Sequence, residues 1–281
     1  MLSEDLRVAE DDRSTVPGRR RPWGLYAVAG AVFSFIYLPI VVLVIFAFNT
    51  SRISTWPMRG FTFKWFGEMV RNQDIRAALQ NSLIIGVTAT LVAMVLGTLC
   101  AYVAHRYRFP GKRWLQRIVL LPMVVPGVVT GIALLSLFDF LGLPLSRLTI
   151  TAGHITFLIA VFFTSVFARL QRLPVELEKA AMDLGASEFG AFRKAVLPNL
   201  RLTLVGAALL AFALSFDEIA VTFFLTGTSN TVPVLIYSMM RLGITPQINA
   251  LATSILTVSV GLVLLGTAIQ RREIGPPAVE Q

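Results

Sequence analysis

Two adjacent carboxylates, Asp217 and Glu218, are the residues of this chain best suited to do chemistry, because they stand in a long apolar segment. A carboxylate in apolar surroundings is costly unless it faces water, protein or a counter-ion. Beside the ring of Phe216, such a charge suits an organic cation through Coulomb attraction and cation–π contact, and Tyr237 is a further candidate for lining its path. Adjacent helical residues point about 100° apart, so only one carboxylate can face a central pathway. The alternative is a structural pair that bonds a neighbouring helix or marks a membrane boundary.

Groups for catalysis, metal ligation or nucleotide binding are not clustered in the sequence. The two histidines, His105 and His154, lack metal-ligand spacing, and no acid–base or nucleophilic arrangement accompanies them. A phosphate-binding loop would read Gly-x-x-x-x-Gly-Lys-Ser/Thr, but Gly111-Lys112 is followed by Arg113. We therefore predict that this chain is not an enzyme and binds no metal or cofactor of its own.

Composition predicts an all-α polytopic membrane protein. The 281 residues are 55% hydrophobic and 15% charged, and the mean hydropathy is +0.71, whereas soluble domains carry about 25% charged residues. Apolar runs of roughly 20 residues are long enough for helices to cross a bilayer. Six transmembrane helices are predicted, at about residues 24–48, 79–104, 115–138, 149–168, 201–225 and 246–269, within a membrane domain spanning residues 23–270.

The net charge of +9 reports membrane topology rather than nucleic-acid binding. With a cytoplasmic amino terminus, 18 of the 25 Lys and Arg residues fall on cytoplasmic segments and 7 on outer ones. This excess is what the positive-inside rule predicts. Both termini, residues 1–22 and 271–281, are therefore expected to be cytoplasmic tails.

The third predicted span contains two prolines one turn apart, Pro122 and Pro126. Proline removes a backbone hydrogen bond and bends a helix. Gly127 and Gly131, spaced as Gly-x-x-x-Gly, permit close helix approach. We expect a kinked helix that packs tightly and can change shape.

Between spans four and five, residues 169–200 form a polar loop with helical patterning. Residues from Glu176 to Leu184 are good helix formers, and Gly185 is a natural left-handed cap. Ser187 can cap a second short helix, which should end before Leu197-Pro198. One interpretation is a compact projection that a partner protein holds, and the other is an amphipathic connector lying on the membrane.

This loop resembles the signature of permease subunits of ABC importers, which reads Glu-Ala-Ala, three residues, Gly, nine residues, Ile, one residue, Leu-Pro. The positions that align with it as coupling residues are Lys179, Ala180, Ala181, Asp183, Gly185, Leu197 and Pro198. Two residues depart from the pattern. Lys179 replaces the usual Glu, with Glu178 just before it, and Ala195 replaces the usual Ile.

The resemblance is closer still to permeases of the spermidine/putrescine type. It is carried by Asn81-Ser82-Leu83, Leu121-Pro122, Pro126-Gly127, Leu214 to Glu218, Pro233 to Met239 and Asn249 to Thr253. It implies a subunit in the bacterial cytoplasmic (inner) membrane that moves a small polar solute, with a polyamine the leading expectation. It also implies a sister permease, two ATPase subunits that use ATP and Mg²⁺, and an extracytoplasmic binding protein. The alternatives are another small solute, such as an amino-acid derivative, opine or phosphonate, or a stand-alone secondary transporter.

Overall fold

The computed structural model describes residues 23–52, 56–174, 176–243 and 245–273, with side chains of the last helix described as far as Gly261. Apart from one isolated bridge between Asn49 and Phe61, the regular structure of these residues is helical. The helices are α2 (Trp23–Ala47), α3 (Lys64–Arg71), α4 (Gln73–Arg106), α5 (Lys112–Val124), α6 (Gly127–Phe140), α7 (Arg147–Leu170), α8 (Glu176–Asp183), α9 (Glu188–Ala191), a π-helix (Phe192–Val196), α10 (Leu197–Asp217), α11 (Thr222–Leu225), α12 (Val232–Arg241) and α13 (Pro246–Glu273). The predicted tail 1–22 lies outside the described residues, as does the tail at the other end from residue 274 onward.

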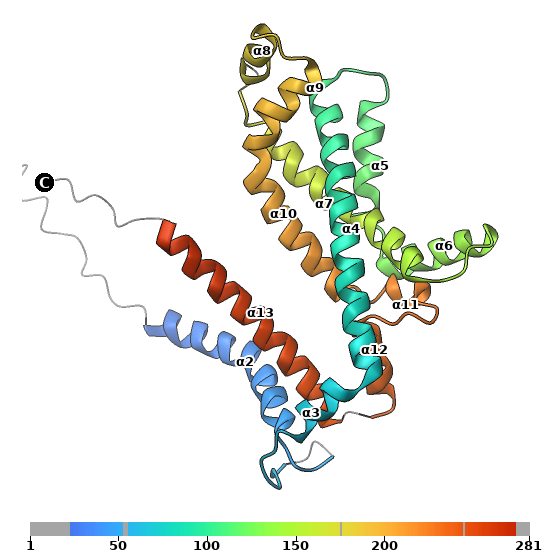
Figure 1. Ribbon diagram of the computed structural model, residues 1–281. Coiled ribbons are helices and arrows are strands. Elements are labelled where there is room, and N and C mark those ends of the chain that lie inside the picture. The colour runs from blue at the N-terminus through green and yellow to red at the C-terminus, as the bar shows by residue number, and fades with distance from the viewer. Residues whose placement is uncertain (1–22, 53–55, 175, 244, 274–281) are drawn as a thin grey trace, which may run out of the picture.

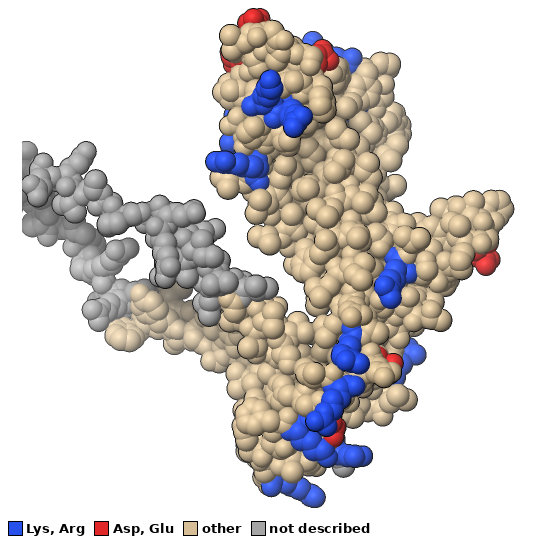
Figure 2. Space-filling view, viewed as in Figure 1, with Lys and Arg blue, Asp and Glu red and all other residues tan. Residues whose placement is uncertain are grey.

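The prediction of a helical chain with several membrane-capable segments is confirmed. By length and composition, α2, α4, α7 and the continuous helix Glu188–Asp217 can each cross a membrane, and a bent pair, α5 with α6, makes a fifth if it is one span. The sixth predicted span, residues 246–269, lies within α13. Lys and Arg side chains gather toward the two ends of the main bundle, with an uncharged surface between them, as Figure 2 shows.

The main bundle is centred on α4 and α7, with α10 packed against both (Figure 1). Ala89 and Ala93 of α4 are fully buried against Leu158 and Phe162 of α7, and Ala207 and Ala211 complete the cluster from α10. Small side chains let helix backbones approach closely in apolar surroundings, where packing rather than water exclusion holds helices together.

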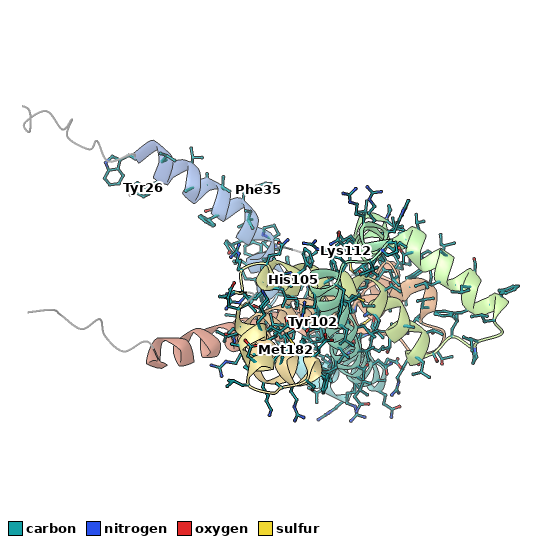
Figure 3. All side chains as sticks on the ribbon, turned by 90° about the horizontal axis from the view of Figure 1, so that it is seen from above. Tyr26, Phe35, Tyr102, His105, Lys112 and Met182 are labelled. Carbon is teal, nitrogen blue, oxygen red and sulfur yellow. The ribbon has the colours of Figure 1, made fainter. Side chains whose placement is uncertain are left out.

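Helices α2 and α13 lie against each other and diverge from the main bundle (Figure 1). The apolar surface of α2 is exposed along most of its length, and Tyr26 and Phe35 lie well away from the bundle in the view from above (Figure 3). The junction is made by Trp65, whose Nε1 donates to the carbonyl of Asn49 at 2.6 Å. Most of the apolar surface of α2 is therefore not covered by any described residue.

The third predicted span is not a single kinked helix. It is two helices, α5 and α6, whose axes meet at 107°. Val125 is extended (ψ 129°) and Pro126 precedes the first residue of α6, because a residue before proline is pushed out of the helical region. Pro122 lies inside α5 without ending it.

The end predicted for the fifth span is wrong, and so is the predicted break in the helix that precedes this span. The second short helix does not stop before Leu197, because the π-helix joins α9 to α10, and the Leu197 N–H donates back to the Phe192 carbonyl. Pro198 is the second residue of α10, which directly follows the π-helix. At the other end α10 stops at Asp217, since Glu218 is extended (ψ 120°), and residues Thr222–Leu225 form the separate helix α11.

Candidate coupling segment and solute pathway

Helix α8 ends where local sequence rules require. Gly185 has φ +87°, in the left-handed region that favours glycine. Its N–H donates to the Met182 carbonyl at 2.8 Å, and the Ala186 N–H donates to the Ala181 carbonyl at 3.1 Å. This pair of bonds is the Schellman arrangement, which satisfies the last carbonyls of a helix and turns the chain sharply.

The chain then re-enters helix at Ser187. The Ser187 Oγ accepts a hydrogen bond from the Gly190 N–H at 3.1 Å and so caps α9. Helices α8 and α9 together form a compact turn at one end of the bundle (Figure 1). We call residues 176–191 the end turn.

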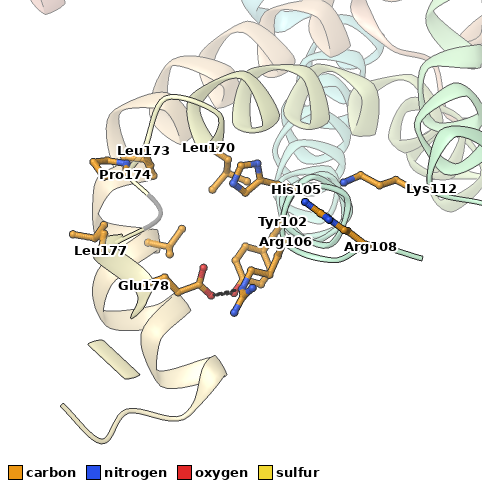
Figure 4. A pocket seen from close by; sticks show the side chains of 11 residues that line it. Tyr102, His105, Arg106, Arg108, Lys112, Leu170, Leu173, Pro174, Leu177 and Glu178 are labelled. Atoms are coloured by element: carbon orange, nitrogen blue, oxygen red, sulfur yellow. Dashed lines mark hydrogen bonds and ion pairs between the residues drawn. The ribbon is translucent and has the colours of Figure 1, made fainter. Parts of the chain in front are cut away.

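Two tyrosine–glutamate contacts attach the end turn to the carboxyl end of α4. The Oε1 of Glu178 accepts from Tyr102 Oη at 2.5 Å and from Arg106 Nε at 3.2 Å (Figure 4). Tyr107 Oη donates to Glu188 Oε2 at 3.0 Å. These contacts cannot be predicted from the sequence alone, because the partners are far apart in the chain and only the packing brings them together.

The signature residues divide between an outer and an inner face of the end turn. Lys179, Ala180, Asp183 and Gly185 are exposed, and Ala181 is half-buried. Two large apolar side chains, Leu184 and Phe189, extend this outer face with 89% and 72% of their surface exposed. Of the remaining signature residues, Leu197 is half-buried and Pro198 exposed at the start of α10. The end turn thus offers a mixed apolar and charged surface with no partner among the described residues.

A hollow of about 440 Å³ lies between the end turn and the bundle. Its polar lining includes His105, Arg106, Arg108 and Lys112, which face Glu178 across it (Figure 4). The Lys112 ammonium also donates to the Tyr107 carbonyl at 3.3 Å. Basic side chains therefore predominate behind the end turn.

Three of the four residues predicted for the solute pathway meet at one place. Phe216, Asp217 and Tyr237 line a hollow of about 600 Å³ between α10, α12 and α13. Tyr237 is not free, since Arg241 donates to its Oη at 2.9 Å and lies 4.8 Å from its ring centroid. The hollow combines one carboxylate with aromatic and apolar walls.

Glu218, the fourth, points elsewhere. Its Oε1 accepts from the Val221 N–H at 2.8 Å. It lines a separate hollow of about 240 Å³ together with Pro122 and Gly127. The two neighbouring carboxylates therefore serve different surroundings, and Asp217 is the one beside Tyr237.

Two further sets of polar contacts join helices of the bundle. His154 is 1% exposed, with Nδ1 2.6 Å from Ser215 Oγ and Nε2 2.8 Å from Thr222 Oγ1. Asn81 Nδ2 donates to the Asn230 carbonyl at 2.8 Å. The Val232 N–H, at the start of α12, donates to Ser82 Oγ of α4 at 2.9 Å. Within the described residues, no group of three or more His, Cys, Asp or Glu side chains is placed to hold a metal.

Comparison with known proteins connects these features to transport. Residues 93–273 match the family described as "Binding-protein-dependent transport system inner membrane component". The chain is 37% identical over 243 residues to the spermidine/putrescine transport system permease protein PotC of Escherichia coli (strain K12), covering 86% of this chain and 91% of that protein. It is 38% identical over 259 residues to the putrescine transport system permease protein PotI of the same strain, covering 89% and 91%.

A solved structure shares the fold. It is a bacterial ABC transporter involved in the import of the acidic polysaccharide alginate, with a TM-score of 0.69 at 17% identity, covering 96% of this chain and 100% of that chain. A second alginate transporter structure, in complex with alginate pentasaccharide-bound periplasmic protein, gives a TM-score of 0.68 at 18% identity, covering 91% and 96%. With its family match and its identity to PotC and PotI, this chain belongs to the binding-protein-dependent transport system inner membrane components.

Proposed function

We propose that this chain is a permease subunit of an ATP-driven importer for a polyamine such as spermidine or putrescine. The names of the relatives PotC and PotI support the solute class. The hollow containing Asp217 supports it independently, because a carboxylate beside the rings of Phe216 and Tyr237 suits an organic cation. The fold alone supports no particular solute, since the structural neighbour is involved in the import of an acidic polysaccharide.

The end turn is the proposed binding site of an ATPase subunit. It is an exposed helical projection whose inner face is bonded to α4 through Glu178 and whose outer face shows Leu184 and Phe189. An ATPase subunit that covers this outer face can push on α4, because the bonds of Glu178 to Tyr102 and Arg106 join the two elements. In this scheme the chain itself is non-catalytic and binds no cofactor, and ATP and Mg²⁺ are used by two partner ATPase subunits.

The proposed assembly has six spans, with α5 and α6 forming the third and α13 the sixth. Both termini and the end turn lie on the cytoplasmic side of a bacterial inner membrane, which agrees with the basic residues near the end turn. The apolar surface of α2 then faces lipid or a sister permease subunit. An extracytoplasmic binding protein delivers solute at the opposite end.

Reconstitution tests this function against its alternatives. The chain is placed in proteoliposomes alone, or with the sister permease and ATPase subunits, and uptake of labelled spermidine and putrescine is measured with the binding protein outside. We expect uptake only in the complete assembly and only with ATP inside. Gradient-driven uptake by the chain alone would identify a secondary transporter, and preferential uptake of an amino-acid derivative, opine or phosphonate would replace the polyamine assignment.

A further inference from the structure

The segment after α10 folds back against α7. An added Cβ on Gly153 of α7 would lie 2.6 Å from Leu225 Cδ1 and 3.0 Å from Val221 Cγ1. Thr149 Oγ1, one turn earlier, lies 3.2 Å from the Leu225 carbonyl. The turn between α10 and α11 is therefore held close to α7 and does not hang free.

His154 is bonded to both sides of this turn. Ser215 stands in the last turn of α10, before Asp217, and Thr222 is the first residue of α11, after Glu218. The imidazole reaches the first hydroxyl at 2.6 Å and the second at 2.8 Å, and all three side chains are buried. The two carboxylates thus lie between the two points that one histidine connects.

One tautomer of the ring fits all of these bonds. Thr222 Oγ1 donates its single proton to the Glu218 carbonyl at 3.1 Å. In that arrangement it accepts from His154, with the proton of the ring on Nε2. With the proton on Nε2, the neutral ring accepts at Nδ1, and Ser215 donates to it. Donors and acceptors form one directed chain that ends on the backbone carbonyl of Glu218.

We propose that His154 is a positioning residue of the solute pathway: by joining Ser215 to Thr222 it fixes the turn between α10 and α11 and so aims Asp217 into its hollow. The inference rests on the proposed role of Asp217 in solute recognition. Its physical basis is that α10 ends at Asp217, so the helix does not itself hold the next four residues. The imidazole bonds one buried hydroxyl on each side of the turn and so connects the end of α10 to the start of α11.

Substitutions of His154 that each keep one of its two hydrogen bonds test the proposal in the complete importer. In His154→Gln the longer amide can still donate to Thr222, whereas in His154→Asn the shorter amide reaches only Ser215. We expect His154→Asn to raise the KM for polyamine uptake about fivefold or more, as for loss of a buried hydrogen bond, and His154→Gln to stay near the original KM. Thr222→Val should follow His154→Asn, and Thr222→Ser should stay near the original value.

Thr164→Val is the matched control, because Thr164 is on the same helix but bonds only within it, to the carbonyls of Ala160 and Val161. Its KM should not change. If His154→Asn lowers only the maximal rate or the amount of complex, or if His154→Gln is equally impaired, the histidine merely stabilises the bundle and the proposal is overturned.

A thiol probe separates this inference from the function on which it rests. Ile219→Cys, in a Cys100→Ser background, places a reactive group within the turn, where the native side chain is 36% exposed. His154→Asn should change its maleimide labelling rate, and an unchanged rate would overturn the positioning role. If the rate changes but Asp217→Asn leaves uptake untouched, the turn is positioned by His154 while the solute role of Asp217 fails.

Discussion

Tyr102 Oη in α4 lies 2.5 Å from Oε1 of Glu178 in α8, joining residues 76 positions apart in the chain. The family signature places its Glu one position later, where this chain has Lys179, which is exposed. Glu178 instead occupies the inner face of α8, where only 13% of its side chain is exposed. Glu178 therefore bonds its own bundle, and the position that the signature gives to Glu presents the Lys179 ammonium group instead.

Removing this acid should loosen the end turn. We predict that Glu178→Ala lowers the free energy of unfolding by about 1–3 kcal/mol, since Tyr102 then loses the acceptor of a partly buried hydrogen bond to a charged group. Denaturant titration of the purified complex, followed by Trp fluorescence, measures the change. Tyr102→Phe combined with Glu178→Ala should cost clearly less than the sum of the two, because both remove one interaction.

Glu188→Ala is the control for that measurement. Its partner Tyr107 is exposed, and exposed polar pairs contribute about 0–1 kcal/mol. Equal losses from Glu178→Ala and Glu188→Ala would show that the inner-face bond has no special weight.

Backbone conformation at Gly185 should matter for coupling. A non-glycine residue in the left-handed region costs about 1–2 kcal/mol, and a β-branched one more. No atom lies within 4 Å of an added Cβ at Gly185, so the cost arises from φ +87° alone. We predict that Gly185→Val lowers the ratio of solute moved to ATP hydrolysed in proteoliposomes, and that Gly185→Asn, which tolerates this region, retains most of it.

Gly111 provides a closely matched comparison. It has φ +89°, and an added Cβ there also meets nothing within 4 Å, but it begins α5 and lies outside the end turn. Gly111→Val should have a similar cost in backbone free energy but should leave the ratio of solute moved to ATP hydrolysed unchanged. If both variants lose the ratio equally, or neither does, the end turn has no special part in coupling.

Close packing of α4 on α7 gives another prediction. An added Cβ on Gly97 would lie 2.6 Å from Phe162 Cβ and 2.7 Å from the Ile159 carbonyl, so the α7 backbone must move. Overpacking of this kind costs about 1–3 kcal/mol, and Gly97→Ala should lower the thermal midpoint of the purified subunit. Gly206→Ala in α10 meets nothing within 4 Å and should be neutral or stabilising, because alanine favours a helix by about 0.5–1 kcal/mol over glycine. Equal midpoints for the two variants would contradict this account of the core.

Much of the local structure follows from short-range sequence rules. The left-handed turn at Gly185 and the cap at Ser187 need only the residues beside them, and both occur as expected. The apolar helices follow from hydropathy for the same reason, since a run of side chains suited to lipid defines its own span. These features are properties of contiguous sequence.

The break after Asp217 could not be predicted in this way. Residues 219–225 continue the apolar pattern, so periodicity extends the span to 225, whereas α10 ends at Asp217 and side-chain bonds take up backbone groups of the residues that follow. The Glu218 side chain takes the Val221 N–H, and Thr222 takes the Glu218 carbonyl. Similarly, the contact between Glu178 and Arg106 joins residues 72 positions apart, and only the packing of α4 against the end turn creates it.

The separation of the two carboxylates leads to the sharpest test of solute recognition. Asp217 shares a hollow with Phe216 and Tyr237, whereas Glu218 is engaged with the Val221 N–H and faces the region of Pro122. We predict that Asp217→Asn raises the KM for spermidine about tenfold, as for loss of roughly 1.4 kcal/mol of charge interaction, with a smaller effect on putrescine, which carries fewer charges. Glu218→Gln keeps an acceptor for the Val221 N–H and should change KM little.

Asp139→Asn is the control, because it removes one exposed acidic charge at the end of α6, outside both hollows. Competition assays with added salt complete the test. A direct charge contact within the hollow should leave much of the difference between Asp217→Asn and the original chain intact at high ionic strength, because charges closer than a Debye length are screened less than distant ones. If Asp139→Asn raises KM as much as Asp217→Asn, or if salt abolishes the difference, the carboxylate acts through the overall field of the outer surface and not through contact with the solute.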